Sequence, residues 1–360
     1  MTDKVALLID GKRVENFESY SIEADLYTAD DAFSLELVNP ETQVSAGNRC
    51  ELTVNDTLEL TGIIDRVTKG YDKSGVRLRV EGRDLMGLLV DTYAEDFVTV
   101  QGKTVKDLAE LLIGKTFRHP ALPFMSRGSI IYQENIVGKL KGKKRTADQP
   151  STAFLDTPQK LSQIEPGMTV FEVLRTYAMS RGLMFYAMPD GTFVFGRPRT
   201  GGGATYQLTC RRDGYGNNVL AGERVDDISK RYSKVTVITQ RQGQDADGMT
   251  AGTVNIKATK EDTTFPFYKP FVTRLNNDSQ SPALHARLLL EKQRHDGFSL
   301  SYRVPGHSQD GTNWRINEIC QVKDEILGVS DSYLIYGRTF ERSKAGTFTR
   351  LRLGPPGVIA

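Results

Sequence analysis

One hairpin pattern occurs twice in this chain, near its two ends. The first copy spans Gly62 to Val80 and the second spans Leu334 to Leu353. Each copy has an apolar pair, a basic-rich first arm, a Lys-small-Gly turn and a second arm in which apolar and basic residues alternate. A period of two predicts a half-buried strand with its arginines in water, and the glycine supplies the positive φ of a short turn.

The similarity extends upstream of each hairpin. Cys50 lies 25 positions before Gly75, and Cys320 lies 26 positions before Gly346. Any two antiparallel hairpins look alike, but landmarks at matched spacing favour two related β-domains. We therefore expect the two ends to fold alike, with Cys50 near Cys320 and Gly75 near Gly346 after superposition.

The cysteines and histidines indicate neither a disulfide framework nor a metal site. Cys50, Cys210 and Cys320 are widely separated and show no CxxC spacing, so buried single thiols are expected. His285 and His295 share a predicted helix, but ten positions separate them by about 15 Å along its axis and they do not share one face. No cofactor and no metal are expected.

Catalytic motifs are equally absent from the sequence. Two GKT tripeptides, which begin at Gly102 and Gly114, lack the upstream glycine of a P-loop. No GxSxG, HExxH or Cys/His nucleophile signature occurs. Carboxylates are plentiful, so a glycosidase-type pair stays open, but none has an apolar setting that would raise its pKa. The sequence predicts that this chain is not an enzyme.

Charge is distributed unevenly along the 360 residues. The net charge is +2, which gives no reason to expect nucleic-acid binding, but residues 1–96 carry −10 and the remainder +12. Opposite net charges on the two parts of the chain indicate binding to charged partners or packing of one part against the other. The apolar run from Val5 to Ile9 is too short for a signal peptide or a membrane span, so we expect a soluble protein made in the cytoplasm, without stable membrane association.

The pattern predicts a mainly β chain with α+β insertions. Residues 1–92 form a first small antiparallel β-barrel of about six strands, closed by a short helix. Residues 93–200 form an α+β domain with two capped helices and a hairpin. Residues 201–240 and 298–360 form a second, similar barrel, which is interrupted by an insertion at 241–297 with one helix.

Two helix starts in the α+β domain carry capping boxes. Thr104 with Asp107, and Thr169 with Glu172, have the spacing at which hydroxyl and carboxylate satisfy free N–H groups. The second helix precedes an apolar hairpin that ends at Phe195. Between the helices lies a basic stretch that is either a solvated loop or a contact for an acidic partner. Its residues are Lys139, Lys141, Lys143, Lys144 and Arg145.

The later part of the chain alternates strand, loop and helix signals. Lys234 to Thr239 is the clearest strand, and we assign it to the second β-domain. Residues 241–280 are polar and read as loop. A helix is predicted from Ala283 to His295, with Pro282 at its start and Gly297 at its end.

Taken together, several segments resemble the baseplate hub protein of Mu-like contractile-tailed phages, and more remotely the N-terminal part of VgrG spikes. They are GRDLMGLLVD from Gly82, the block GMTVFEVLRTYAMSRGLMFYAMPDGTFVFGRP from Gly167, ALHARLLLEKQR before FSLSYRVPG, and the segment around Trp314. The resemblance covers essentially the whole chain. These motifs are architectural, so the resemblance indicates the fold and the assembly of the protein and assigns no catalytic residue.

The resemblance implies a trimeric ring in which two β-barrels per chain alternate, joining a six-fold tail tube to a three-fold spike. DNA would pass through the channel without sequence-specific binding. The chain ends soon after the second hairpin, so the spike is expected to be a separate protein. The expected place is the virion tail baseplate, assembled in the bacterial host cytoplasm with the tail tube and other baseplate proteins.

Two other functions stay open at the sequence level. One is a tail-associated peptidoglycan hydrolase, and the other is the hub of a phage-derived secretion or bacteriocin device. For the ring, the charge asymmetry suggests a contact between subunits. Residues 97–200 carry +7 and the second β-domain +4, so we expect the acidic face around Asp25, Asp30 and Asp31 to lie against a basic surface of the next chain.

Overall fold

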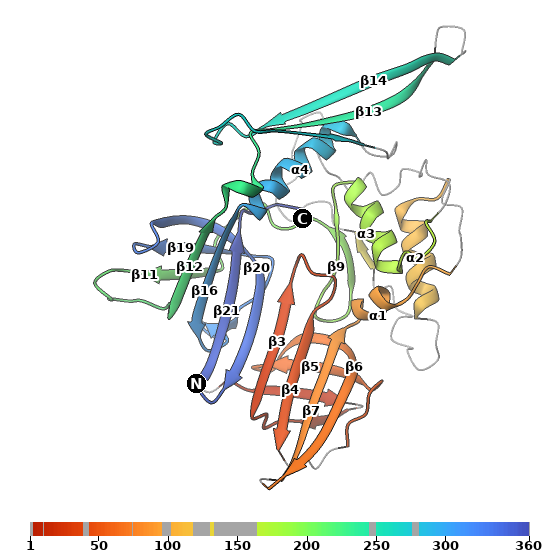
Figure 1. Cartoon of the computed structure of the whole chain (residues 1–360). Coiled ribbons are helices and arrows are strands. Elements are labelled where there is room, and N and C mark those ends of the chain that lie inside the picture. Colours follow the sequence, from red (N-terminus) through yellow and green to blue (C-terminus); the bar gives the residue numbers. More distant parts are fainter. Residues whose placement is uncertain are drawn as a thin grey trace.

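The computed structural model describes residues 3–9, 11–38, 43–73, 75–95, 102–117, 130–132, 164–244, 250–275 and 281–359. The fold is mainly β with few helices, as the sequence predicted. Figure 1 shows a large sheet that runs through both β-domains, a helical region beside it, and a separate small sheet next to helix α4.

The N-terminal β-domain contains seven strands in the hydrogen-bonded order β3-β4-β7-β6-β5-β1-β2. The pairs β1–β2 and β6–β7 are antiparallel hairpins. These strands are β1 (Val5–Ile9), β2 (Lys12–Val14), β3 (Ser19–Asp25), β4 (Ala32–Val38), β5 (Arg49–Val54), β6 (Thr57–Asp72) and β7 (Gly75–Asp84).

The C-terminal β-domain has the order β12-β16-β21-β20, with β19 on β20 and β11 on β19. A two-stranded ribbon of β17 and β18 lies between β16 and β19 in sequence. The strands are β11 (Tyr206–Cys210), β12 (Ala221–Asp226), β16 (Phe298–Pro305), β17 (Ser308–Gln309), β18 (Thr312–Asn313), β19 (Glu318–Asp324), β20 (Val329–Ser343) and β21 (Gly346–Gly354).

The two β-domains repeat one another strand by strand. The order β5-β6-β7-β4-β3 in the first corresponds to β19-β20-β21-β16-β12 in the second. Both long hairpins have a register shift, between Ile64 and Arg66 and between Ile335 and Gly337, at the same distance from the turn glycine. Those glycines have φ angles of 122° and 121°. The domains differ in that β1 pairs antiparallel with β5, whereas β11 pairs parallel with β19.

The expected closed barrels are not formed, because the described strands of both domains join in one 13-stranded sheet. The link is β20, whose outer part pairs antiparallel with β3, from Gly337 opposite Asp25 to Arg342 opposite Tyr20. A strand whose edge pairs with the neighbouring domain cannot also close its own barrel. The two domains accordingly share one hydrophobic core.

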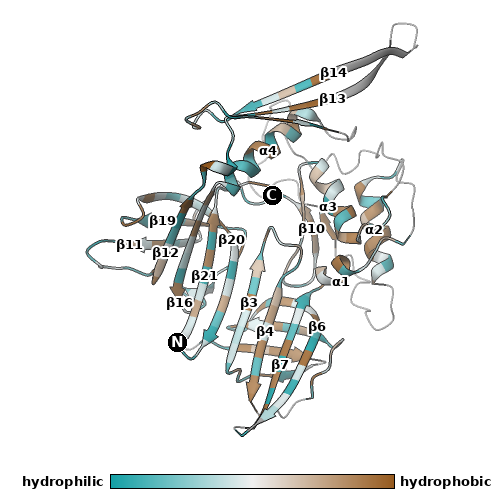
Figure 2. Ribbon diagram, viewed as in Figure 1, coloured by the Kyte–Doolittle hydropathy of each residue, from teal (hydrophilic) through white to brown (hydrophobic). Residues whose placement is uncertain are grey.

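Burial follows the predicted alternation in the hairpin arms. Leu78 and Val80 in β7, and Leu351 and Leu353 in β21, are buried, while the basic residues between them point outward. Figure 2 shows this alternation as bands of hydrophobic and hydrophilic colour on the strands of the first domain. The prediction that Cys50 and Cys320 are buried single thiols is confirmed. Cys210 was expected to be buried and is only half-buried, because β11 is an edge strand with one neighbour.

The helical region lies next to the first β-domain. Both predicted capping boxes are present, at Thr104 and Thr169. Strands β9 and β10 form an antiparallel hairpin that packs on α3, and β8 pairs parallel with β10. The basic stretch from Lys139 to Arg145 lies outside the described residues. The elements are α1 (Met86–Asp91), α2 (Val105–Thr116), β8 (Ile130–Tyr132), α3 (Val170–Ser180), β9 (Met184–Ala187) and β10 (Phe193–Gly196).

A separate three-stranded sheet with helix α4 follows β12 in the chain. It contains β13 (Lys234–Gln244), β14 (Thr250–Glu261) and β15 (Pro270–Arg274), so the assignment of residues 241–280 to loop was wrong. The clear strand that begins at Lys234 belongs to this sheet and not to the second β-domain.

Helix α4 (Pro282–Asp296) has the predicted start and end, and it covers the sheet through Ala286 and Leu290, which pack on Val235 and Val237. Short η3 (Ile228–Lys230) leads from β12 into this region. Across the described part of the chain, no helix has the length and apolar character that crossing a membrane requires.

Candidate assembly site at the junction of the two β-domains

A deeply buried ion pair lies where the two β-domains meet. Arg338 of β20 forms an ion pair with Glu59 of β6, and these side chains are only 3% and 4% exposed. The same guanidinium nitrogen, Nη1, also donates to the carbonyl oxygen of Trp314 at 3.1 Å. A charge that is buried this deeply requires a partner, and each of these residues supplies one to the other across the domain boundary.

Asn313 extends this pair into a network. Its Nδ2 donates to Glu59 Oε1 at 2.7 Å and to the carbonyl oxygen of Val54 at 2.8 Å. Its Oδ1 accepts from Asn55 Nδ2 at 3.0 Å. Since the partners come from both domains, the network fixes the relative position of the domains and supplies partners to the buried Glu59 carboxylate and Asn313 amide.

A buried histidine makes a second polar link. The Nε2 of His307 and the hydroxyl of Tyr20 in β3 are 2.8 Å apart, and Nδ1 lies 3.1 Å from Thr349 Oγ1. The imidazole packs on Phe340 with ring centroids 4.4 Å apart. Burial lowers the pKa of His307 to about 4, so the ring is neutral at physiological pH and serves as a hydrogen-bonding spacer.

Asp25, one of the three predicted interface residues, bonds across β20 within its own chain. Its Oδ2 lies 2.8 Å from Arg352 Nη2, with Gly337 between the two side chains. A Cβ added at Gly337 would lie 2.4 Å from Arg352 Nε and 2.8 Å from Asp25 Oδ2, so only glycine leaves room for this contact. Burial raises the pKa of Asp25, and the neighbouring arginine works against that rise.

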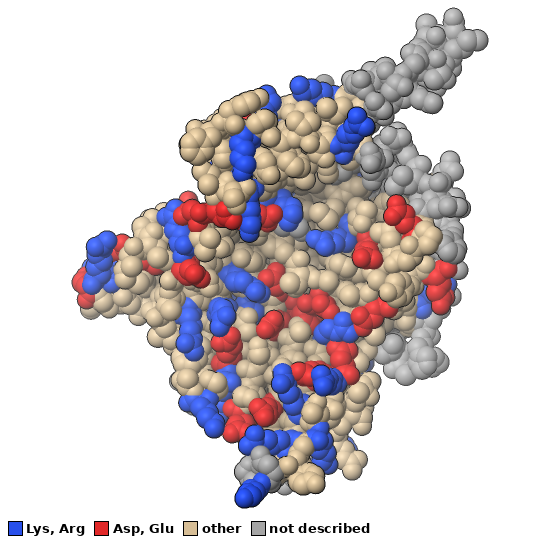
Figure 3. Space-filling model, in the orientation of Figure 1, with Lys and Arg blue, Asp and Glu red and all other residues tan. Residues whose placement is uncertain are grey.

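Asp30 and Asp31, the other two predicted residues, lie in the turn from β3 to β4. Asp30 forms an ion pair with Arg83 at 3.1 Å. Asp31 accepts a hydrogen bond from the Asp25 backbone N–H at 2.9 Å. Burial raises the pKa of Asp31 to about 7 and holds the pKa of nearby Asp84 well above its usual range. Figure 3 shows that charges of both signs are interspersed over this face of the molecule.

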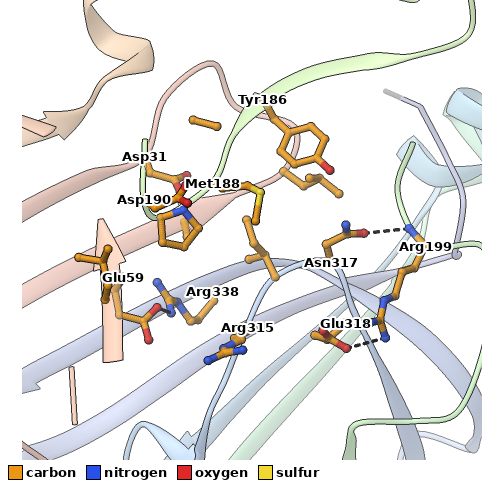
Figure 4. Close-up of a pocket in the computed structure, with 16 residues that line it drawn as sticks. Asp31, Glu59, Tyr186, Met188, Asp190, Arg199, Arg315, Asn317, Glu318 and Arg338 are labelled. Atoms are coloured by element: carbon orange, nitrogen blue, oxygen red, sulfur yellow. Dashed lines mark hydrogen bonds and ion pairs between the residues drawn. The ribbon is translucent and has the colours of Figure 1, made fainter. Parts of the chain in front are cut away.

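A pocket of about 520 Å³ opens beside the junction (Figure 4). Some of its polar groups are paired with one another: Arg199 forms an ion pair with Glu318 at 2.7 Å, and its backbone N–H donates to Asn317 Oδ1 at 2.8 Å. The described residues contain no group of three or more potential ligands that could hold a metal ion. The paired side chains at this junction link the two β-domains to each other. The lining residues are Ala24, Leu26, Asp31, Leu58, Glu59, Tyr186, Ala187, Met188, Pro189, Asp190, Arg199, Arg315, Ile316, Asn317, Glu318 and Arg338.

Comparison with known proteins finds similarity to phage tail and baseplate proteins. Residues 4–84 match the family described as Mu phage baseplate assembly protein GpP-like, N-terminal, and residues 231–287 match the third domain of NMB1110-like tail proteins. The chain is also similar to the baseplate hub protein gp44 of Escherichia phage Mu, with 22% identity over 99% of this chain and 88% of that protein.

Solved structures agree with this class. The tail protein of Neisseria meningitidis MC58 has 25% sequence identity and a TM-score of 0.76, covering 98% of this chain and 96% of that chain. A chain of a Francisella PdpA–VgrG complex shares the fold at 10% identity, with a TM-score of 0.57 over 99% of this chain and 58% of that chain. The resemblance to Mu-like baseplate proteins inferred from the sequence is therefore confirmed.

Proposed function

We propose that this chain is a structural component of a phage baseplate hub. The observation that carries the proposal is whole-length similarity to a Mu baseplate hub protein, in a chain that repeats one β-domain twice around a rigid buried joint. The matched relatives are tail and baseplate proteins, and the chain is accordingly structural and not an enzyme.

The hub acts as a homotrimer whose six β-domains form a ring between a six-fold tail tube and a three-fold spike. Two similar β-domains per chain support this arrangement, because three copies then present six similar units. In the virion this ring transmits force and leaves an axial path for DNA, which passes without sequence-specific contacts. Its partners are the tail tube, other baseplate proteins and a separate spike protein, and assembly takes place in the host cytoplasm.

The domain division and the acidic subunit contact remain part of this proposal. The units of the ring are the first β-domain, within residues 1–92, and the second, which contains β11, β12 and residues 298–360. Asp30 pairs with Arg83 of its own chain but keeps 23% of its side chain exposed, against 10% for Asp25, so we infer that it meets the neighbouring chain.

The test is the mass of the purified full chain in solution, by native mass spectrometry and light scattering. Three copies per particle are expected, and a monomer at all concentrations would refute the trimer. An assay for release of fragments from purified peptidoglycan distinguishes the hub from a tail-associated hydrolase, for which activity would be seen. Whether the hub serves a phage or a derived bacteriocin device is decided by the particle from which it is isolated.

A further inference from the structure

Two strand edges of the large sheet have no partner among the described residues. One is the outer part of β6, from Arg66 to Tyr71, which is paired only with β7. The other is β12, which is paired only with β16 and is exposed along its whole length. In Figure 1 these strands end the front sheet on its two sides. Unpaired edges of this length invite pairing with another strand.

The internal repeat identifies the strand in the other β-domain that is equivalent to each free edge. In the second domain, the stretch equivalent to the free part of β6 is Gly337–Arg342 of β20. That stretch pairs with β3 of the first domain, and the strand equivalent to β3 in the second domain is β12. The two free edges are thus the same two surfaces that already pair once inside each chain.

From this internal joint, we propose that β6 of one copy pairs antiparallel with β12 of a second copy of this chain. Transfer of the β3–β20 register places Arg66 opposite Asp227 and Tyr71 opposite Gly222. The contact is heterologous, since the two surfaces differ, so it continues around a ring until the last copy meets the first. The inference rests on the proposed trimer and assigns the surfaces that close it.

Charge supports this pairing. The free stretch of β6 carries Arg66 and Lys69, whereas the opposing stretch carries Glu223, Asp226 and Asp227. The Arg66 side chain is 74% exposed, and its contact with Glu81 is long, at 3.9 Å. Its guanidinium can therefore pair with the opposing carboxylate. These opposite charges favour the antiparallel register and disfavour pairing of two like edges.

One opposing pair has like charge, because Lys69 faces Arg224. The arginine is held by Asp226 at 2.7 Å, which lies diagonally from Lys69 in the proposed register. The carboxylate therefore lies between the two cations. Apolar surface is also available to the contact, since Tyr71 is 90% exposed and Val225 is 44% exposed in the single chain.

Disulfide cross-linking tests the register. In the full chain with Cys210→Ser, Thr68→Cys and Val225→Cys are directly opposite in the proposed pairing, at a separation that a disulfide spans. Mild oxidation is expected to give covalent dimers and trimers that reductant reverses. The pair Thr68→Cys with Arg224→Cys is one residue out of register, on the opposite face, and should not cross-link.

An internal pair serves as the positive control. Thr339 and Glu23 oppose one another in the β3–β20 joint, so cysteines there should cross-link within one chain whatever its oligomeric state. A protein that is trimeric by mass yet forms no 68–225 disulfide would overturn the pairing and leave the trimer standing. A protein that stays monomeric would overturn both. Cross-linked chains longer than three would support the pairing and refute a three-membered ring.

Discussion

At the residue scale, the joint between the β-domains depends on a few buried polar side chains. Arg338 was not predicted as a buried residue, because its segment reads as a basic arm in water. Its carboxylate partner, Glu59, is 279 positions away, and no local pattern reports a contact over that separation. The only local signal is that Arg338 shares a strand face with buried Phe340.

Removing this guanidinium should strongly destabilise the fold. Arg338→Met leaves Glu59 buried without its counterion, so we expect the free energy of unfolding to fall by about 3–5 kcal/mol. Chemical denaturation measures the loss. The control is Arg350→Met, which removes an arginine that is 56% exposed and 3.3 Å from Glu341, and should cost less than about 1 kcal/mol.

A double variant separates lost pairing from lost packing. Glu59→Met with Arg338→Met removes both charges, and should be more stable than Arg338→Met alone because no buried charge is left unpaired. Equal stability of the single variant and the Arg350→Met control would show that the buried pair contributes little.

Asp31 should make stability depend on pH. Its pKa in the folded protein is about 7, above the value of about 3.9 for an unfolded chain, so the folded state favours the protonated carboxyl. Its contribution to stability is therefore complete below about pH 4 and is lost as pH rises through 7. His307, whose pKa is lowered to about 4, acts in the opposite direction between about pH 4 and 6.5.

The variant Asp31→Asn isolates the carboxyl. Its amide oxygen still accepts from the Asp25 N–H, but it carries no charge at any pH. We expect the variant to gain stability relative to the natural chain as pH rises from 4 to 8, by at least about 1 kcal/mol. Thermal unfolding across this range measures the difference, and parallel curves for the two proteins would contradict the prediction.

At the element scale, the sequence predicted what short-range patterns specify. The paired hairpins follow from alternation and turn glycines, and both capping boxes follow from a threonine with an acidic residue three positions later. Strands β14 and β15 were missed because their polar residues resemble a loop. The β3–β20 pairing was missed because register between distant strands depends on tertiary packing, and this pairing replaces the barrel closure that was expected.

Strand β20 also explains why a glycine lies at position 337. Gly337→Ala would place a methyl group against the Asp25–Arg352 contact, with backbone strands on both sides. We expect a loss of roughly 1–3 kcal/mol in unfolding free energy, typical of overpacking. Gly203→Ala is the control, because nothing lies within 4 Å of an added Cβ there. If the two variants are equally stable, the contact across β20 is not limited by space.

At the scale of the whole molecule, the two β-domains pack against each other and are not independent units. Their apolar residues form one cluster, in which Leu35 and Val80 of the first domain join Tyr302 and Phe340 of the second. The third sheet has a separate small cluster with α4. The proposed transmission of force would depend on such a joint, because a loosely linked pair of domains would turn about the link.

This arrangement predicts that both β-domains unfold in one step. Amides in β4 and β16, which are equivalent central strands of the two domains, should exchange with solvent at the same free energy, because opening either domain exposes the shared core. Native-state hydrogen exchange read by mass spectrometry measures this, on protein kept below the concentration at which it assembles. Amides of β13, whose buried side chains belong to the separate small cluster with α4, should open at a lower free energy.

The variant Arg338→Met should lower the protection of amides in β4 and β16 together and leave the protection of β13 unchanged. Loss of protection in β16 alone would mean that the domains open independently and that the shared cluster is only a contact surface.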